Sequence, residues 1–380
     1  MKETNINNLV FRLSLLLTGG IALWAVAFNK SFTIVSDAIY NFLTKQFGWL
    51  YLAAMLFFVF FILLIAFSKW GKIRLGPDDS RPEYSTVSWF AMLFGAGMGV
   101  GLVFWGISEP VSHYIAPMAG IAPASAEAAD FAMKASFMHW GIHPWANYAI
   151  IGLALAYFQF RKGKPGLISS VLEPVIGTKR HWLNHLVDIL AVFATVAGVV
   201  TSLGLGVLQI NSGLNYLFGI PTSLLIQIII IAVISVIYIW SAVSGIEKGI
   251  KLGADGVLST EALQEVAATP EVGLFVVMQK YPFGMLLSLV ALVLLCTFFI
   301  TSANSGTFVL SMLTSDGALN PPNNKKVLWG IVQSVMAVGL LIAGGLKPLQ
   351  IISIAAAFPF IFIMLFTCVS LVKALRDETV

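Results

Sequence analysis

The sequence has little charge and little cysteine. Only 11% of its 380 residues are charged, whereas 58% are hydrophobic, and a soluble domain has roughly a quarter of its residues charged. No soluble core could bury this much apolar surface, so lipid must be the solvent for much of the chain. The two cysteines, Cys296 and Cys368, both lie inside apolar runs. We interpret them as apolar filler rather than as a disulfide or a metal site.

Common enzyme and pump motifs are also missing. The sequence has no Gly-x-Ser-x-Gly elbow, no Walker loop and no His-Glu-x-x-His pair. The chain is therefore predicted not to be an enzyme, and the lack of an ATPase motif argues against a primary pump. Its net charge of +4 is small. In a membrane protein this excess indicates basic loops on one side of the bilayer rather than nucleic-acid binding.

Long apolar runs are present instead. A membrane helix needs about 20 mostly apolar residues, and an all-helical fold is predicted because lipid offers backbone groups no other partner. The alternating pattern of an outer-membrane barrel does not occur. The first run is interpreted as an uncleaved span rather than a signal peptide, because it is long and only Lys2 precedes it. The predicted spans are residues 9–28, 49–68, 87–107, 137–159, 187–210, 220–241, 284–307, 328–346 and 350–372.

Basic residues predict the orientation of these spans. They follow the second, fourth and sixth spans, precede the eighth and close the chain, so these connections and the N-terminus are predicted to be cytoplasmic. One junction breaks the alternation. The stretch 247–251 is basic, whereas 253–273 has no Lys or Arg and carries four acids. Either the charge pattern misleads here, or an odd number of spans is missing between these stretches.

A glycine run lies inside the third predicted span. Residues 94–110 read FGAGMGVGLVFWGISEP, with glycine at every second position from Gly95 to Gly101. Each glycine costs a helix about 1 kcal/mol relative to alanine. Close helix packing is one explanation, but it favours small residues three and four apart on one face. A spacing of two places glycines all round the helix, which favours a locally unwound backbone of the kind that binds substrates in secondary transporters.

Aromatic residues gather in the stretch HWGIHPWANY, residues 139–148. Trp140, Trp145 and Tyr148 lie within three helical turns, as in an interfacial aromatic belt or in a cage for a cationic ligand. A quaternary ammonium has no N–H to donate, and aromatic faces attract it at about 0.5–2 kcal/mol each. His139 and His143, like His181 and His185, are four residues apart, but no cysteine or carboxylate nearby completes a metal site.

Hydroxyl groups mark a third candidate region, TFFITSANSGTF at residues 297–308. Thr301 and Ser302 are adjacent in an apolar span and could either bond back to helix carbonyls or bind Na⁺. Thr195 and its neighbouring hydroxyls are interpreted mainly as packing residues. Glu109 and Asp188 lie near span ends and are interpreted as facing water. Because ionisable groups are scarce within spans, coupling to Na⁺ is favoured over coupling to H⁺.

Several of these stretches together resemble the betaine/carnitine/choline transporter (BCCT) family, and in particular the sodium-coupled glycine betaine transporters of Gram-positive bacteria. The resemblance covers nearly the whole chain. It rests on RPEYSTVSWFAMLFGAGMGVGLVFWGISEP, FMHWGIHPWANYAIIGLALAYFQFRKGKP, TVAGVVTSLGLGVLQIN, WSAVSGIEKGIK and FFITSANSGTFVLSMLTS. It implies a LeuT-like inverted-repeat fold with twelve spans, of which spans 3–12 form two five-helix repeats. In the family, the Gly-Met-Gly form of the glycine run accompanies sodium coupling.

The resemblance also implies site residues. A second family sodium site uses two threonines one turn apart; Thr195 matches the first, but the second falls on Val199, which puts that site in doubt. The implied substrate-binding residues are Trp140, Trp145, Tyr148, Gly97, Gly99 and Gly101. The implied sodium ligands are the carbonyls of Gly95, Met98 and Phe298 and the hydroxyls of Thr301 and Ser302, with Thr195 in the second site.

The chain departs from the family at the junction between the stretches 247–251 and 253–273. Three spans are absent near 251–253, including the eighth, which in the family completes the ammonium cage. The predicted organisation is one transmembrane transporter domain over 1–380. It comprises two peripheral N-terminal helices in 1–68, most of the first repeat in 87–251, and the remainder of the second repeat in 253–380.

The implied function is uptake of glycine betaine or a related quaternary-ammonium osmolyte, coupled to Na⁺ symport, for osmoprotection. Because half the cage is missing, this chain is expected not to alternate access normally. The alternatives are a transport-incompetent deletion variant, a ligand-binding remnant or a passive channel. The implied partners are a zwitterionic osmolyte, Na⁺ as the coupling ion without another cofactor, the lipid bilayer and a homotrimer, but no nucleic acid. The implied location is the bacterial cell membrane.

Overall fold

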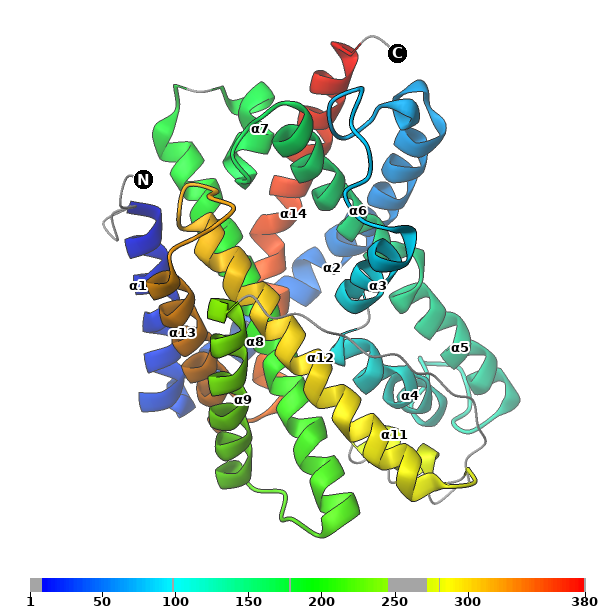
Figure 1. Ribbon diagram of the computed structural model, residues 1–380. Coiled ribbons are helices and arrows are strands. Elements are labelled where there is room, and N and C mark those ends of the chain that lie inside the picture. Colours follow the sequence, from blue (N-terminus) through cyan, green and yellow to red (C-terminus); the bar gives the residue numbers. More distant parts are fainter. Residues whose placement is uncertain (1–8, 98, 178, 245–271, 280, 379–380) are drawn as a thin grey trace. The chain divides into compact units, whose positions relative to one another are not determined.

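The computed structural model of the chain describes residues 9–97, 99–177, 179–244, 272–279 and 281–378 (Figure 1). All regular secondary structure in these residues is helical, as the sequence predicts. The predicted deletion near 251–253 lies outside the described residues. Two compact units form along the chain: unit 1 comprises Met1–Glu83, Ile142–Gly198 and Gly306–Val380, and unit 2 comprises Tyr84–Gly141 and Val199–Ser305.

Six described helices are long and apolar enough to cross a membrane. They correspond to six of the predicted spans. They are α1 (Leu9–Ala27), α2 (Asn29–Phe67), α8 (His181–Phe218), α12 (Gly284–Leu313), α13 (Asn323–Ile342) and α14 (Leu346–Arg376).

Of the other three predicted spans, two are interrupted in the described residues and one falls on a single helix. The span 87–107 falls on α3 (Thr86–Gly97) and α4 (Val100–Ile115), and 137–159 falls on α5 (Ala126–Trp140), α6 (Ile142–Ala156) and a π-helical turn at Tyr157–Arg161. The span 220–241 falls on α9 (Leu224–Ser244), of which Leu224–Val236 is an apolar stretch. The total of nine spans stays a prediction.

The start of α2 differs from the sequence prediction. The span was expected at 49–68, with 29–48 as a connection, but one helix of 39 residues runs from Asn29 to Phe67. Residues 29–47 contain neither proline nor glycine, so nothing in their backbone chemistry interrupts the helix. Only Phe28 separates α1 from α2.

Unit 1 is held together by close helix packing. Helix α1 lies beside α13 (Figure 1). A Cβ atom at Gly339 of α13 would stand 3.1 Å from Val26 Cγ2 and 3.3 Å from the Ala22 carbonyl oxygen. The glycine therefore lets the two backbones approach, as small residues do at membrane helix interfaces. Helix α2 packs on α6 and α14, around a core that includes the buried Phe58, Tyr157 and Leu371.

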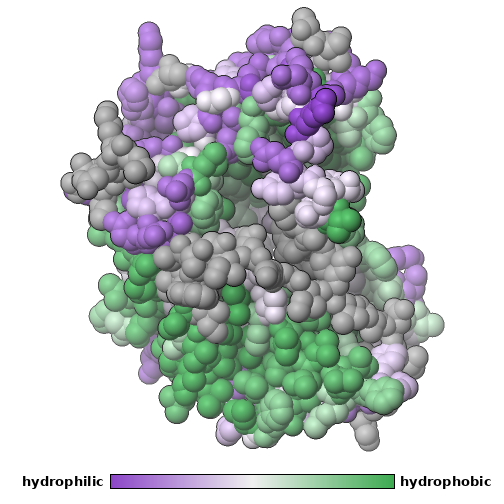
Figure 2. Space-filling model, viewed as in Figure 1, coloured by the Kyte–Doolittle hydropathy of each residue, from purple (hydrophilic) through white to green (hydrophobic). Residues whose placement is uncertain are grey.

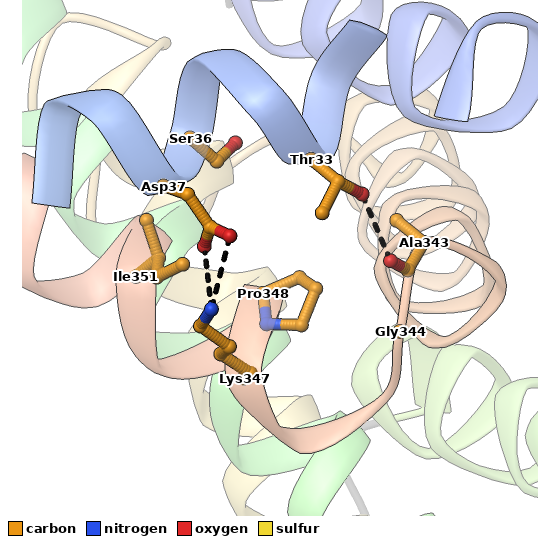
Figure 3. Close-up of a pocket in the computed structure, with 8 residues that line it drawn as sticks. All are labelled: Thr33, Ser36, Asp37, Ala343, Gly344, Lys347, Pro348 and Ile351. Atoms are coloured by element: carbon orange, nitrogen blue, oxygen red, sulfur yellow. Dashed lines mark hydrogen bonds and ion pairs between the residues drawn. The ribbon is translucent and has the colours of Figure 1, made fainter. Parts of the chain in front are cut away.

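Polar contacts fasten the first turns of α2 to the end of α13 and the beginning of α14. The Thr33 hydroxyl donates to the Ala343 carbonyl at 3.0 Å, and Lys347 Nζ lies 2.9 and 3.0 Å from the two carboxylate oxygens of Asp37. Figure 3 shows these side chains lining a small pocket between these helices. Both ends of α14 are thus tied to other elements of unit 1, because a second network holds its C-terminal end.

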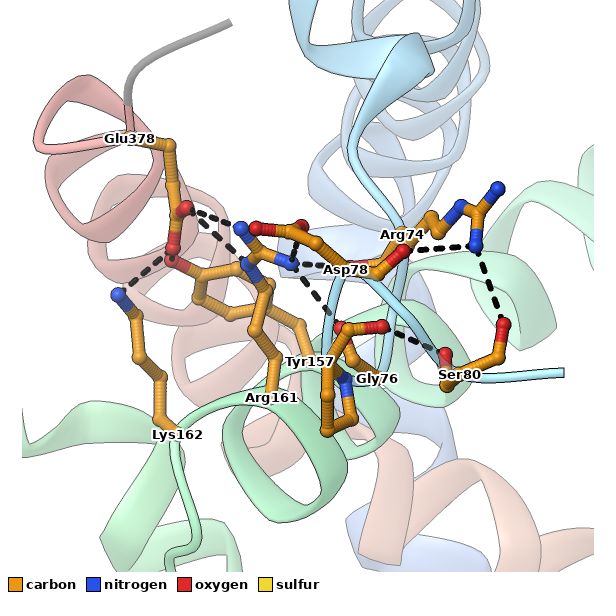
Figure 4. A network of polar contacts seen from close by, with 9 residues as sticks. Arg74, Gly76, Asp78, Ser80, Tyr157, Arg161, Lys162 and Glu378 are labelled. Atoms are coloured by element: carbon orange, nitrogen blue, oxygen red, sulfur yellow. Dashed lines mark hydrogen bonds and ion pairs between the residues drawn. The ribbon is translucent and has the colours of Figure 1, made fainter.

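That second network centres on Arg161. Its Nε and Nη2 atoms donate to Oε2 of Glu378 at 3.0 and 2.8 Å, and Nη1 donates to Asp78 at 2.8 Å (Figure 4). Lys162 Nζ lies 2.7 Å from the other oxygen of Glu378. These hydrogen bonds from Arg161 and Lys162 lower the pKa of Glu378 to about 2. Figure 2 shows hydrophilic residues gathered at this end of unit 1, near α7 (Ile168–Ile176) and the end of α14.

Asp188 does not face water, contrary to the prediction. It lies in the unit 1 part of α8 and is only 4% exposed. Its carboxylate accepts from the Ser169 backbone N–H at 3.0 Å and from the Ser169 hydroxyl at 2.7 Å. Asp188 therefore satisfies a donor in the first turn of α7, where a helix leaves its N–H groups without intrahelical partners. A long-range cap of this kind leaves no local sequence signal.

Unit 2 contains α3, α4, α5, α9, the short α11 (Gly273–Met278), and parts of α8 and α12. Helix α4 packs on α5 and on α11. Glycines on α8 again allow close approach, here to aromatic rings. A Cβ atom at Gly206 would stand 2.3 Å from Phe299 Cδ2, and one at Gly213 would stand 2.3 Å from Phe275 Cζ. These contacts hold α12 and α11 close to α8.

Candidate functional site

The glycine run interrupts a helix, as predicted. Helix α3 ends at Gly97 and α4 begins at Val100. Between them Gly99 has an extended backbone, with φ −101° and ψ 175°. The break leaves a helix C-terminus with its last carbonyls and a helix N-terminus with its first amides. Gly95 and Gly97 belong to the last turn of α3, whereas Met98 lies outside the described residues.

The Ser302 hydroxyl faces this break. A Cβ atom at Gly99 would stand 3.9 Å from Ser302 Oγ, and both residues belong to unit 2. The structure therefore brings together one predicted substrate residue and one predicted sodium ligand that lie about 200 positions apart. A side chain larger than hydrogen at Gly99 would occupy the space in front of the hydroxyl.

Thr301 bonds back to its own helix. Its hydroxyl lies 3.1 Å from the carbonyl oxygens of Thr297 and Phe298, which is the common arrangement for membrane threonines. A hydroxyl that donates its hydrogen keeps two lone pairs, so this contact does not prevent the oxygen from binding a cation. Two of the predicted sodium ligands, the Thr301 hydroxyl and the Phe298 carbonyl, are direct neighbours.

Trp140 lies against the glycine run from α5. Its Cη2 atom would be 3.6 Å from a Cβ atom at Gly101, an ordinary van der Waals contact. The indole Nε1 donates to Oε2 of Glu109 at 2.6 Å. The indole is thus held both at its N–H edge and at its far carbon edge by α4, within unit 2.

Glu109 was interpreted from the sequence as facing water, and this is wrong. The residue is 7% exposed and its carboxylate contacts His139 and Trp140. Sequence reasoning missed it because α5 follows α4 through a connection whose path the sequence does not reveal. One available signal was a carboxylate at the end of an apolar run with a histidine, His113, one helical turn later.

The other two predicted cage residues are in unit 1. Trp145 and Tyr148 lie on α6 with ring centroids 6.1 Å apart and planes inclined by 48°. They are 43% and 66% exposed. The sequence placed all three aromatic residues on one span, but α5 ends at Trp140 and α6 begins at Ile142. The structure therefore brings Trp145 and Tyr148 together in unit 1 and joins Trp140 to the glycine run in unit 2.

Thr195 also belongs to unit 1. Its hydroxyl donates to the Ala191 carbonyl at 2.8 Å, which is again a bond back to the helix. The residue lines a pocket between α8 and α14 together with Gly198, Ser353 and Phe360. Its role in a second sodium site stays a prediction.

These features define a class of protein. A multi-pass helical chain with an interrupted, glycine-rich helix facing a hydroxyl-bearing helix has the architecture of secondary transporters, which bind substrates and ions at discontinuous helices. The chain belongs to the betaine/carnitine/choline transporter (BCCT) family. The profile of this family matches residues 9–259 and 254–380. Members of this family are transporters, not enzymes.

Individual relatives are similar along almost their whole length. The glycine betaine transporter OpuD of Bacillus subtilis is 38% identical, with 97% of this chain and 94% of the relative aligned. A probable glycine betaine transporter of Desulfitobacterium hafniense is 36% identical, over 94% and 95%. The ectoine/hydroxyectoine transporter of Virgibacillus pantothenticus is 33% identical, over 99% and 98%.

The alignments also bear on the predicted deletion. The alignment with the Bacillus subtilis protein runs over 483 positions, whereas this chain has 380 residues. About a hundred positions of that relative therefore have no residue here. The two matches to the family profile meet at residues 254–259, close to the junction that the charge pattern singled out.

Proposed function

We propose that the chain binds glycine betaine or a related quaternary-ammonium osmolyte, together with Na⁺, at the broken helix of unit 2, which is the binding step of secondary active uptake. The observation that carries the proposal is the junction of α3 and α4, where Gly99 faces the Ser302 hydroxyl and Gly101 faces Trp140. Amides at a helix N-terminus attract carboxylates, and an aromatic face attracts an ammonium without N–H groups. A zwitterion that carries both groups matches these two neighbouring environments.

The kinds of oxygen atom that could bind a cation at this site support coupling to Na⁺. The end of α3, the Phe298 carbonyl and the hydroxyls of Thr301 and Ser302 offer neutral oxygen atoms. Freed carbonyls at discontinuous helices coordinate Na⁺ in secondary transporters. A neutral set of this kind favours a monovalent cation over a divalent one, which is usually held by carboxylates.

A second candidate function is binding without transport. It is favoured by the absence of about a hundred positions that the Bacillus subtilis relative has. If those positions include helices that move during alternating access, the remaining chain would keep the broken helix but could not carry the substrate across. We expect this outcome for the 380-residue chain.

The test compares uptake with binding. The chain is expressed in a bacterial strain without betaine carriers, and accumulation of radiolabelled glycine betaine is measured with and without Na⁺, with the Bacillus subtilis relative as positive control. The purified chain is assayed for betaine binding in parallel, with ectoine as a competitor. We expect Na⁺-dependent binding without accumulation.

Each of the other possible results of these assays supports a different function. Sodium-dependent accumulation by this chain would establish transport and contradict the expected loss of alternating access. Accumulation that neither saturates nor depends on Na⁺ would indicate a passive channel. Absence of both binding and accumulation, with the protein present in the membrane and the relative active, would contradict the proposed function.

A further inference from the structure

Glu109 is a buried carboxylate clamped between two donors of one neighbouring helix. His139 Nδ1 lies 2.7 Å from Oε1 and 2.9 Å from Oε2, and Trp140 Nε1 donates to Oε2 at 2.6 Å. Since an ionised carboxylate can only accept, the hydrogen in the His139 contact belongs to Nδ1. His139 thus limits the orientations that the Glu109 carboxylate can adopt, and the carboxylate in turn limits those of the Trp140 indole. Short bonds to a charged acceptor are the stronger and more directional kind.

The same helix provides the second constraint on the indole. Gly101 and Glu109 lie eight residues apart on α4, and helical side chains lean toward the N-terminus of their helix. The Glu109 carboxylate therefore reaches back along α4 toward Gly101, and the Trp140 ring extends along the same face from Glu109 to Gly101. The hydrogen bond fixes one edge of the ring and the glycine backbone supports the other.

Besides His139, one further titratable group is recorded beside the carboxylate among the described residues of α4, α5 and α11. His113 Nε2 lies 3.6 Å from Oε1, one turn further along the same helix, and its ring packs edge-on against Phe131 of α5. On α5, Lys134 is paired with Asp130. Helix α11 carries no titratable side chain. The contacts of Glu109 in the described part of unit 2 are therefore directed mainly at His139 and Trp140.

We propose that Glu109 is the positioning residue for Trp140, setting the orientation in which the indole presents its face to the quaternary ammonium, with His139 holding the carboxylate in place. Glu109 itself acts through Trp140 rather than on the substrate. The inference rests on the proposed function, which assigns Trp140 to the substrate site. It adds a residue that the family resemblance did not supply and that the sequence interpretation had placed in water.

Betaine binding to the purified chain tests the proposal. Glu109→Ala removes the acceptor and is expected to raise the Kd for radiolabelled glycine betaine about fivefold to tenfold, whereas Glu109→Gln keeps an acceptor oxygen and stays within about twofold. Glu127→Ala, which removes an exposed carboxylate from α5 of the same unit, is the matched control and should leave the Kd unchanged. If Glu109→Ala does not purify as a folded protein, Glu109→Met replaces it.

A double-mutant comparison separates positioning from general support of the fold. In a Trp140→Phe background the indole N–H is gone, so Glu109→Ala should cause no further loss of affinity. An equal loss in both backgrounds would overturn the proposal, and so would an unchanged Kd in Glu109→Ala alone. If instead Trp140→Phe itself leaves the Kd unchanged, the proposed function of Trp140 fails.

A measurement without ligand distinguishes failure of the positioning role of Glu109 from failure of the proposed betaine binding. The chain is labelled with 5-fluorotryptophan, and the Trp140 resonance is assigned from its absence in Trp140→Phe. We expect this fluorine resonance to shift in Glu109→Ala and Glu109→Met and to stay in place in Glu127→Ala. An unshifted resonance in both Glu109 variants would overturn the positioning role, even if the chain binds no betaine.

Discussion

Ser302 Oγ faces the backbone of Gly99, at the break between α3 and α4, with 3.9 Å between the hydroxyl oxygen and the place where a Cβ would stand. A hydroxyl group and a stretch of unwound backbone that are distant in the sequence thus lie next to each other in unit 2. The contact needs no charged side chain, which explains how an apolar sequence can still offer a polar site.

Removal of this hydroxyl is expected to weaken Na⁺ dependence. Ser302→Ala should raise the Na⁺ concentration for half-maximal betaine binding about tenfold, which corresponds to roughly 1.4 kcal/mol, because one oxygen ligand is lost. Titration of Na⁺ against bound radiolabelled betaine measures it. Thr297→Val removes a hydroxyl that bonds back to Val293 on the same helix, and this control should leave the curve in place. An unaltered Na⁺ curve in Ser302→Ala would remove Ser302 from the site.

Gly101 is expected to tolerate alanine but not leucine. A Cβ atom there meets the Trp140 ring at 3.6 Å, so Gly101→Ala adds a normal contact, whereas Gly101→Leu must displace the ring. We expect the leucine variant to weaken betaine binding about tenfold or more. Gly106→Leu on the same helix, where a Cβ atom meets nothing within 4 Å, should bind normally. Equal affinities in both leucine variants would contradict the contact.

The Glu378 network predicts a pH dependence of stability. Because the pKa of Glu378 is lowered from 4.5 to about 2, its contribution is fully present above about pH 4.5 and is lost as the pH falls toward 2. Glu378→Gln should therefore lower the thermal midpoint in detergent by about 2–4 °C at pH 7, with the difference from wild type shrinking at acid pH. Asp377→Asn removes an exposed charge at the neighbouring position and serves as control. A constant difference across the pH range would count against the network.

Asp188 and Ser169 should behave as a coupled pair. Asp188→Ala leaves the Ser169 N–H and hydroxyl without their buried acceptor, at a cost of about 1–3 kcal/mol. Asp188→Asn keeps one acceptor oxygen and should cost less. Thermal unfolding of Asp188→Ala, Ser169→Ala and the double variant measures the coupling. Strictly additive losses would show that the buried bond does not stabilise the start of α7.

The sequence predicted the class of fold and the helix break, because both depend on local chemistry. Apolar runs of membrane length require helices, and glycine at every second position removes the side chains that keep a helix regular. The end of α3 at Gly97 and the start of α4 at Val100 confirm that reasoning. The family resemblance implied that Ser302 lies near Gly95 and Met98 of the glycine run, but its contact with Gly99 was not predicted.

Tertiary contacts account for what the sequence could not give. Glu109 and Asp188 were interpreted as facing water because they lie near predicted span ends, yet each is buried by a partner from another helix. Helix α2 was expected to begin at residue 49, because a hydropathy pattern reports the apolar stretch of a helix and not its full length. The charge pattern could single out the junction near 251–253 because the positive-inside pattern does not depend on tertiary contacts, and the two matches to the family profile overlap close by, at 254–259.

The length of α2 determines how deep the charged residues near its two ends lie in the bilayer. At about 1.5 Å per residue, the 39 residues from Asn29 to Phe67 extend about 58 Å, nearly twice the roughly 30 Å of a hydrocarbon core. The Asp37–Lys347 pair near its start and Lys69 just beyond its end lie about 48 Å apart along the helix axis. This separation is close to the 40–45 Å that separates the two water boundaries of a bilayer. Because 48 Å slightly exceeds this thickness, both charges lie at headgroup level when α2 is tilted by roughly 20–35° from the bilayer normal. A change in membrane thickness would then draw one of them toward hydrocarbon or leave it standing in water.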